Sequence, residues 1–424
     1  MKIMVCLISR QHVPNLLAIR SEEPNPEKLV LIVSPFMKRE NRHNQLLDAL
    51  KVGGLDYTPI EKHDFRCLKN EYSVSMAKDL FQEIYNDHQN DELIINLTGG
   101  TKPMSIGAYE FSLENHLRAL YVPEGNQRQA IDLLDNAFIR SLKHKTTTGE
   151  FLAGYGFDVI NEDKLKNTEE KARSLVKLSA MIASKIDDNG LRGMLAYLQI
   201  LKEGMKVLDP KGWERNGLNI SSEDNVFLDD KDLRDEISSQ FGLHVNGTKL
   251  IGTLSKHATE FLTGKWLEFF VWSLLEFLVG RGIWDLHLGV SAGKDGPARN
   301  NDLDVSFMKN QSLCIVECKT GERKSGPEAD NILYKIEAIK SGPKALRVKS
   351  YLATTWPEVI DEKTGEIKEA LKNRCDLYGC EIVHGAMLRE MAKLYLNERS
   401  EDKPGLSRMV ADAFNINLEQ ETSK

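Results

Sequence analysis

Short apolar runs alternate with helical segments along the first 143 residues. Four runs predict strands, at 2–9, 28–34, 91–97 and 117–123. The first three contain almost no polar residues, which is typical of strands that are buried on both faces of a parallel sheet. Helical patterns lie between them, near 40–51, 73–88 and 103–115. This order predicts a doubly wound, Rossmann-like α/β sheet.

The pattern changes twice after residue 143. Residues 144–165 break the alternation, 166–205 have apolar positions at helical spacing, and 206–250 are polar and irregular. A second α/β pattern begins at about 255, with these expected elements: a long helix at 262–280, strands near 284–290, 302–309, 312–319 and 346–354, and helices near 329–340, 365–373 and 385–397. We therefore divide the chain into an N-terminal domain (1–143), a connecting, largely helical region (144–254) and a C-terminal domain (255–424).

Composition narrows the class of protein. Of the 424 residues 41% are hydrophobic and 28% charged, which is enough apolar material for folded cores. The net charge of −7 argues against a general polycation, so any nucleic-acid binding needs a local basic patch. The six cysteines include no CxxC pair, which argues against structural zinc and a disulfide framework. The N-terminus has no signal-peptide pattern and the apolar stretch 266–279 is interrupted by glutamates, so we expect a cytoplasmic protein.

The segment INLTGGTKPMS (95–105) is the strongest local feature of the first domain. A buried strand ends at Leu97, and the paired glycines that follow allow backbone amides to approach a ligand closely. Pro103 suits the first turn of a helix, whose N-terminus favours anions. These residues predict a phosphate-binding edge of the sheet, together with Ser9, Arg10, Gln11 and Asn15 after the first strand. The alternative is a tight strand-to-helix turn that needs glycine for geometry alone. Because GxGxxG and GxxxxGK[ST] are both absent, we do not expect an NAD or P-loop site.

The segment NNDLDVSFMKNQSLCIVECKTG (300–321) carries the candidate chemistry of the second domain. Side chains alternate between the faces of a strand, so Glu317 and Lys319 share one face. Charged groups on a central strand are costly to bury without partners. A divalent metal would explain them, with Asp304 and Glu317 as oxygen ligands of Mg²⁺ or Mn²⁺ and Lys319 orienting water or neutralising charge. Glu268, on a helix that is apolar nearly all round, is a further ligand candidate. The alternative is a buried Glu–Lys ion pair with no catalytic role.

The first domain resembles the CRISPR-associated Rossmann-fold (CARF) sensor domains. The resemblance rests on ISRQHVPN (8–15) and NLTGGTKPMS (96–105). It implies a homodimer that binds a cyclic oligoadenylate, expected to be cyclic tetra-adenylate because a two-fold interface presents the same residues twice. The ligand contacts that it implies are Ser9, Gln11, Asn15, Thr98, Gly99, Gly100, Thr101 and Lys102.

The second domain resembles the PD-(D/E)xK nucleases. Its Asn301-Asp302-Leu303-Asp304-Val305 and Glu317-Cys318-Lys319-Thr320 are similar to segments of CARF-fused CRISPR ancillary nucleases, although Leu303 replaces the usual proline. The resemblance implies a restriction-endonuclease-like domain with catalytic Glu268, Asp304, Glu317 and Lys319, of which the three carboxylates hold the metal. A basic run follows the site (Lys335, Lys340, Lys344, Arg347 and Lys349); it suits either a nucleic-acid contact or a solvated helix face.

Together the two resemblances imply an activator-gated, metal-dependent endonuclease of type III CRISPR defence. The sequence leaves two alternatives open: a CARF-type transcription regulator that does not cut, and a stand-alone restriction-type endonuclease. It does not decide between single-stranded RNA, single-stranded DNA and duplex DNA as substrate. Nor does it decide whether the first domain degrades its own activator, or what residues 144–254 do.

Overall fold

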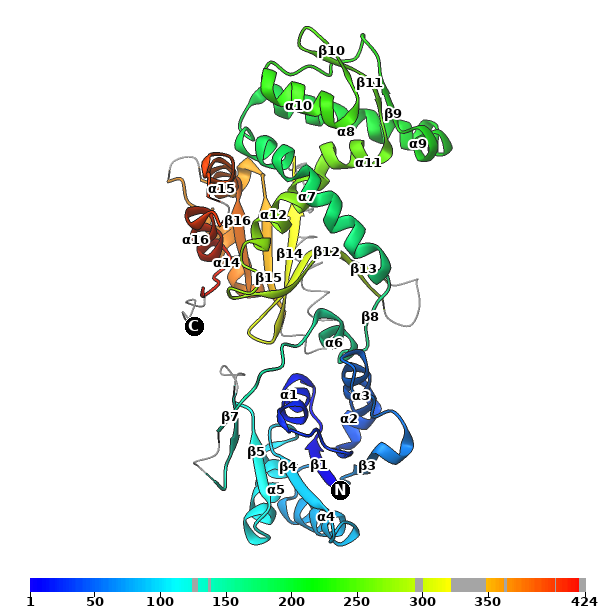
Figure 1. The fold of residues 1–424 in the computed structure, drawn as a ribbon, viewed down its shortest axis with the longest axis vertical. Coiled ribbons are helices and arrows are strands. Elements are labelled where there is room, and N and C mark those ends of the chain that lie inside the picture. Colours follow the sequence, from blue (N-terminus) through cyan, green and yellow to red (C-terminus); the bar gives the residue numbers. More distant parts are fainter. Residues whose placement is uncertain are drawn as a thin grey trace.

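The computed structural model describes residues 1–123, 129–135, 139–293, 300–321, 348–361, 364–400 and 402–418. The helix expected near 329–340 and the basic run other than Lys349 lie outside the described residues. Within them, no helix is long and apolar enough to cross a membrane. Figure 1 shows the N-terminal domain at one end of an elongated molecule and the C-terminal sheet near its middle.

The N-terminal domain is built on a seven-stranded sheet of order β3-β2-β1-β4-β5-β6-β7. β1 to β5 are parallel, whereas β6 and β7 pair in antiparallel fashion. The strands are β1 (Lys2–Leu7), β2 (Lys28–Val33), β3 (His63–Cys67), β4 (Glu92–Asn96), β5 (Arg118–Tyr121), β6 (Gln129–Asp132) and β7 (Ile139–Ser141). The four predicted strands and the Rossmann-like order are confirmed, and β3, β6 and β7 were not predicted.

Helices cover both faces of this sheet because successive side chains of its central strand point to opposite sides. Ile3 and Val5 of β1 pack with α4 and α5, whereas Met4 and Cys6 pack with α1 and α3. The helices are α1 (Val13–Ser21), α2 (Pro35–Arg39), α3 (Arg42–Val52), α4 (Val74–Asp87) and α5 (Lys102–Glu114), with the short η1 (Ile60–Lys62) before β3. The predictions for α3, α4 and α5 are confirmed.

The C-terminal domain contains a six-stranded mixed sheet of order β16-β15-β14-β13-β12-β8. β12, β13 and β14 form an antiparallel meander, and β14, β15 and β16 are parallel. The strands are β8 (Asp158–Val159), β12 (Trp284–Gly293), β13 (Asn300–Lys309), β14 (Ser312–Lys319), β15 (Lys349–Thr354) and β16 (Cys380–His384). The helices of this part are α7 (Glu162–Ser184), α12 (Trp266–Glu276), α14 (Glu369–Tyr378), α15 (Gly385–Asn397) and α16 (Pro404–Ala413), with the short η5 (Pro357–Val359) after β15.

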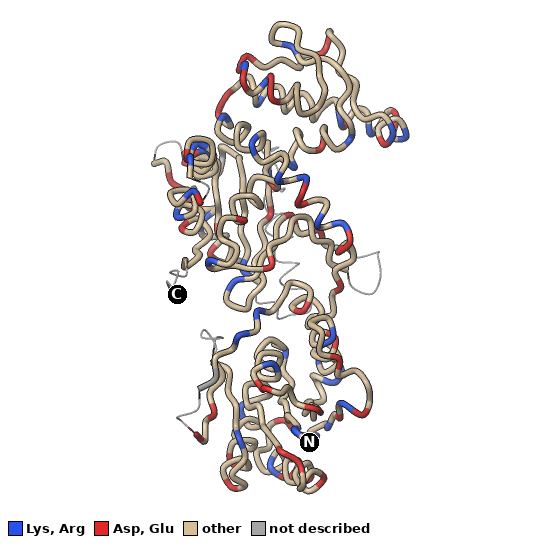
Figure 2. Tube along the Cα trace, viewed as in Figure 1, with Lys and Arg blue, Asp and Glu red and all other residues tan. Residues whose placement is uncertain are grey.

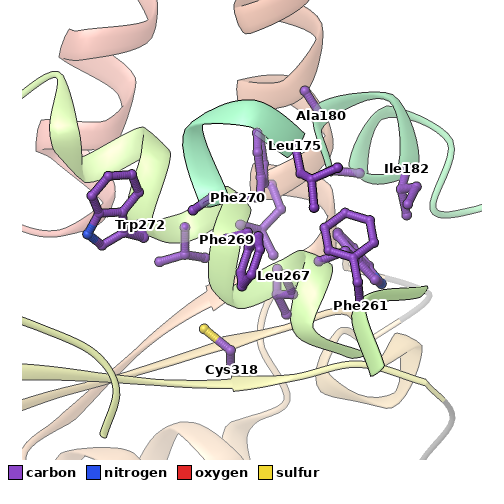
Figure 3. Close-up of a cluster of buried hydrophobic side chains, with 14 of the residues drawn as sticks. Leu175, Ala180, Ile182, Phe261, Leu267, Phe269, Phe270, Trp272 and Cys318 are labelled. Carbon is purple, nitrogen blue, oxygen red and sulfur yellow. The ribbon is translucent and has the colours of Figure 1, made fainter. Parts of the chain in front are cut away.

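The long helix predicted at 262–280 is confirmed as α12, but it begins later and ends earlier than predicted. The chain first forms α11 (Lys256–Glu260), then one wide π-type turn η2 (Phe261–Lys265), and only then α12. Gly264 interrupts the helical backbone within the wide turn. Figure 3 shows the buried side chains around α12, among them Phe270 and Trp272, and Cys318 of β14 points into the same cluster.

Residues 189–260, which we call the middle unit for their place in the sequence, pack beside the start of α12 and share its apolar cluster. The middle unit contains α8 (Asn189–Leu208), α9 (Pro210–Asn216), α10 (Lys231–Phe241) and α11, with the three-stranded sheet β10-β11-β9. Its strands are β9 (Leu218–Ile220), β10 (His244–Asn246) and β11 (Lys249–Leu254). The polar pattern at 206–250 had predicted none of these strands.

The two sheets are joined by α6 (Thr148–Ala153) and its flanking residues. Thr146 donates its backbone N–H to Gln311 Oε1 (2.9 Å) and accepts a bond from the Trp284 indole (2.8 Å). A single apolar cluster runs from α1 and α3 to Met308 and Ile315 of β13 and β14. The N-terminal and C-terminal domains therefore share part of one core.

Candidate active site and ligand pocket

The antiparallel pairing of β13 with β14 brings together three of the predicted site residues. Val305 lies opposite Val316, which sets Asp304 beside Glu317 on the next rung. Asp304 Oδ2 accepts a hydrogen bond from the backbone N–H of Cys318 (2.8 Å). The ammonium of Lys319 lies 2.6 Å from Glu317 Oε1 and 3.7 Å from Asp304 Oδ2. Two carboxylates and one ammonium thus converge where the C-terminal end of β14 lies beside the middle of β13.

Charge in this cluster changes the proton affinities of its members. Burial and the Asp304 carboxylate raise the pKa of Glu268 to about 8, against the opposing effect of Lys265 and Lys319. Burial by itself would lower the pKa of Lys319, but Asp304 and Glu317 outweigh it and raise that pKa. Lys319 therefore stays a cation, whereas Glu268 holds its proton up to about pH 8.

The donor set fits a hard divalent cation in its chemistry. Oxygen ligands from carboxylates suit Mg²⁺ and Mn²⁺. Burial, and after it the Asp304 carboxylate, raise the pKa of Glu268, and a nearby divalent cation would favour its ionised form. Among the described residues, no three His, Cys, Asp or Glu side chains are grouped closely enough to hold a metal ion. Instead, Asp304 and Glu317 both face Lys319. Glu317 is 1% exposed and Lys319 31%, so this ion pair opens to solvent at the lysine.

The second candidate site is a hollow at the carboxyl edge of the N-terminal parallel sheet. Two adjoining cavities, of about 440 and 300 Å³, share Arg10, Phe36, Met37 and Glu71. The smaller one is also lined by Ser9, Gln11, Gly100 and Thr101, four of the predicted ligand contacts. Loops after β1, β2, β3 and β4 therefore meet there, as the doubly wound order requires.

Two family models match the chain, one in each of the two domains. Residues 3–150 match the Card1 CARF domain, and residues 255–378 match the Card1-like endonuclease domain. The chain thus contains a Card1-type CARF domain and a Card1-like endonuclease domain. The resemblances found in the sequence and the predicted fold class are thereby confirmed, and the chain is a nuclease with an N-terminal CARF domain.

Two solved structures share the fold over almost the whole chain. Can2 from Sulfobacillus thermosulfidooxidans, solved in complex with cyclic tetra-adenylate, has a TM-score of 0.66 at 22% identity and covers 94% of this chain and 100% of its own. The protein VC1899 from Vibrio cholerae has a TM-score of 0.72 at 19% identity and covers 95% and 99%. At these identities the likeness establishes the fold alone. No curated protein matches the chain.

The other four predicted ligand contacts of the CARF domain lie outside the described cavity lining. Asn15 is buried, donates to the Leu7 carbonyl (2.9 Å) and accepts from Asn96 (2.6 Å). The Thr98 hydroxyl accepts the backbone N–H of Val122 (2.9 Å), so it ties β4 to β5.

Gly99 and Lys102 differ from these two in what surrounds them. A Cβ at Gly99 would lie 1.8 Å from the Leu7 carbonyl oxygen, so glycine is needed there for close packing. Lys102 is exposed at the start of α5. Asn15, Thr98 and Gly99 therefore form the scaffold beneath the hollow.

Several lining residues of the hollow were not among the predicted contacts. They come from the turns after β2 and β3: Ser34, Pro35, Phe36, Met37, Arg39, Lys69, Asn70, Glu71 and Tyr72. The Arg10 and Arg39 guanidiniums lie 5.0 and 5.8 Å from the centre of the Phe36 ring. The signal in the sequence was SPFMKR (34–39), which directly follows a predicted buried strand at the same sheet edge.

Proposed function

We propose that this chain is a cyclic oligoadenylate-activated, metal-dependent endonuclease of type III CRISPR defence. The observation that carries the proposal is the convergence of Asp304, Glu317 and Lys319 in an endonuclease domain joined to a CARF domain with an open polar hollow. Cyclic tetra-adenylate is the proposed activator, because Can2, which shares the fold, was solved with that ligand.

The residues divide the catalytic work by their chemistry. Asp304 and Glu317, with Glu268 from α12, would hold Mg²⁺ or Mn²⁺, which supplies Lewis acidity and a water of lowered pKa. Lys319 keeps its proton beside two carboxylates, so it neutralises charge that develops on the phosphate being cut. The carboxylates in turn orient the ammonium through the 2.6 Å contact with Glu317.

The hollow of one chain accounts for only part of an activator site. Arg10, Arg39 and Lys69 give it positive charge for phosphates, and Phe36 and Tyr72 give it aromatic surface. We propose a homodimer in which two such hollows face one two-fold ring. Moving a nuclease from about 1% to 99% active requires about 5.5 kcal/mol of preferential binding to the active form. Four phosphates held by two protomers are a suitable source of that free energy.

A cleavage panel tests the proposal. Purified protein is incubated with single-stranded RNA, single-stranded DNA and duplex DNA, in Mg²⁺ and in Mn²⁺, with cyclic tri-, tetra- or hexa-adenylate or none. We expect cutting that depends on the metal and on the tetra-adenylate. Cutting without regard to activator would favour a stand-alone endonuclease, and activator binding with no cutting would favour a transcription regulator.

Variants assign the two sites. We expect Glu317→Ala and Lys319→Ala each to lower cutting by about 10³-fold or more while activator binding is unchanged. Asp302→Asn is the matched control, because this exposed carboxylate on β13 bonds to Ser291 (2.6 Å) and not to the cluster. Lys102→Ala and Arg10→Ala should weaken activation and leave metal binding intact. Full cleavage by Glu317→Ala would refute the site assignment.

A further inference from the structure

The catalytic helix α12 begins from an unusual turn. Residues Phe261–Lys265 form a π-type turn that Gly264 interrupts, and Glu268 follows within the first turn of α12. Single π-type turns are uncommon and often occur at functional sites. The direction in which Glu268 leaves the helix therefore depends on how this turn is held.

Thr263 bonds this turn to the helix before it. Its hydroxyl donates to the Thr259 carbonyl oxygen (2.7 Å), and Thr259, which is fully buried, donates in the same way to the Ser255 carbonyl oxygen (3.0 Å). Bonds of this kind from a hydroxyl to the carbonyl four residues earlier bend helices. Thr263 thus sits at the point where the helix changes course.

A lysine of the middle unit holds the Thr263 hydroxyl. Lys202 of α8 donates from Nζ to Thr263 Oγ1 (2.9 Å). An ammonium can only donate, so Thr263 must accept that bond and give its one proton to Thr259. Two hydrogen bonds therefore fix the rotamer of Thr263, one from each side.

The burial of Lys202 is costly for an ordinary packing role. The residue is 9% exposed, and burial together with Lys206 lowers its pKa. The carboxylate of Glu203 lies 3.9 Å from its ammonium, but Glu203 is 54% exposed and lies closer to Lys206 (3.2 Å). An apolar side chain would suit the neighbouring Leu198 without this cost. The ammonium is explained by the bond that it donates to the turn.

The turn also touches the catalytic strand. A Cβ at Gly264 would lie 3.5 Å from Thr320 Oγ1, directly after Lys319. On the other side, the charge of Lys265 acts on Glu268. The turn thus lies between α8 and the cluster formed by β13 and β14.

We propose that Lys202 is a positioning residue of the nuclease site: through Thr263 it holds the turn 261–265, and so sets where Lys265 and Glu268 stand relative to Asp304 and Lys319. The inference rests on the proposed nuclease function. It gives the middle unit a task in catalysis, since α8 lies outside both matched family segments.

The test compares Lys202→Met with Lys206→Met. Both remove an ammonium from α8, but Lys206 is 41% exposed and no described contact joins it to Thr263. We expect Lys202→Met to lower activator-stimulated kcat about 10- to 100-fold with KM for the oligonucleotide changed less than about 2-fold. Lys206→Met should leave kcat unchanged. Thr263→Val should reproduce the loss and Thr263→Ser should restore most of the activity.

A second measurement reports on the stability of the turn 261–265 directly and requires no metal. Hydrogen exchange of the amides at 261–268 should be faster in Lys202→Met than in wild type, with the same unfolding midpoint. Combining Lys202→Met with Thr263→Val should cost no more activity than either alone, because both break one connection.

The outcomes separate the two proposals. Wild-type kcat in Lys202→Met overturns the inference. So does a rise in KM shared with Lys206→Met, which would indicate a substrate contact on the surface of α8. A wild-type protein that cuts nothing in the whole panel instead overturns the nuclease function on which the inference rests.

Discussion

A single methyl group at Gly154 would clash with His12, the residue directly after Gln11 of the hollow. Gly154 ends α6 with φ −63° and ψ −10°, a conformation that alanine adopts freely. A Cβ there would nevertheless lie 2.1 Å from Nε2 and 2.2 Å from Cδ2 and Cε1 of His12. Any loss of stability in Gly154→Ala therefore arises from this contact and not from the backbone.

The His12 ring has little room to move away. It is 4% exposed and lies edge-on to Tyr155 and Phe151, with ring centres 4.8 and 5.8 Å apart. Restoring van der Waals distance requires a shift of roughly 1.4 Å. Such overpacking costs about 1–3 kcal/mol, against which glycine-to-alanine replacement contributes about 0.4–1 kcal/mol through the unfolded chain. We expect a net loss of about 1–2 kcal/mol.

Chemical denaturation of wild type and variant measures this loss. Gly193→Ala is the matched control, since Gly193 lies in α8 with nothing within 4 Å of the added Cβ. It should gain about 0.4–1 kcal/mol. In a His12→Ala background Gly154→Ala should instead gain about 0.4–1 kcal/mol, as the control does. The coupling free energy in a double-mutant cycle is then the overpacking cost alone, about 1–3 kcal/mol. Equal penalties in both backgrounds would refute the reasoning.

Two further predictions concern buried charges near the domain contact. Burial lowers the pKa of His287, but Asp285 and Glu169 outweigh it and raise that pKa to about 9; its stabilisation is therefore complete below the unfolded pKa of about 6.5 and is lost as pH rises through 9. The difference in unfolding free energy between wild type and His287→Gln should shrink between pH 6 and pH 9.5, and a constant difference would contradict this assignment. Arg20→Met removes the 2.9 Å partner of Glu150, whose side chain is fully buried, and should cost about 2–3 kcal/mol by the same measurement; Arg20→Met/Glu150→Gln should recover part of it.

The sequence predicted the strands that are buried on both faces along nearly their whole length. β1, β2 and β4 are buried along nearly their whole length, and uninterrupted apolar runs reveal such strands. β3 is the edge strand of the sheet and contains Asp64 and Arg66, which pair with each other, so no apolar pattern announces it. α1 was missed for the opposite reason. Its residues are nearly all buried, so it has no polar face to show a helical period.

The candidate nuclease residues could be found because their spacing is local. Glu317 and Lys319 are two residues apart on β14. A short hairpin turn joins β13 to β14, and the antiparallel pairing of these two strands sets Asp304 beside Glu317. The ligand hollow depends instead on the order of strands in the sheet. Phe36 and Tyr72 are brought beside Arg10 by the crossovers that place β2 and β3 next to β1. No motif within one segment could reveal that meeting.

The charged residues are spread evenly along the chain, which is consistent with binding sites that depend on a few nearby side chains. Figure 2 shows acidic and basic residues interspersed along the described chain, and the net charge is −7. Nucleic acid and activator phosphates must therefore be held by a few positioned cations and not by a general field. We expect this role for Arg10 and Arg39, which lie beside Phe36 at the hollow, and for Lys319 in the candidate nuclease cluster.

The α6 segment makes close contacts with both domains, so we expect it to transmit a conformational change from one to the other. On one side Gly154 receives His12, and on the other the Thr148 N–H donates to Asp285 of β12 (2.5 Å), which pairs with the strand of Asp304. Because one apolar cluster spans both domains, pulling them apart would expose buried surface. Activator binding should then act through a small shift of α6 together with β12. A folded Gly154→Ala protein that keeps unstimulated cutting but loses stimulation would support this; full stimulation would place the coupling outside α6.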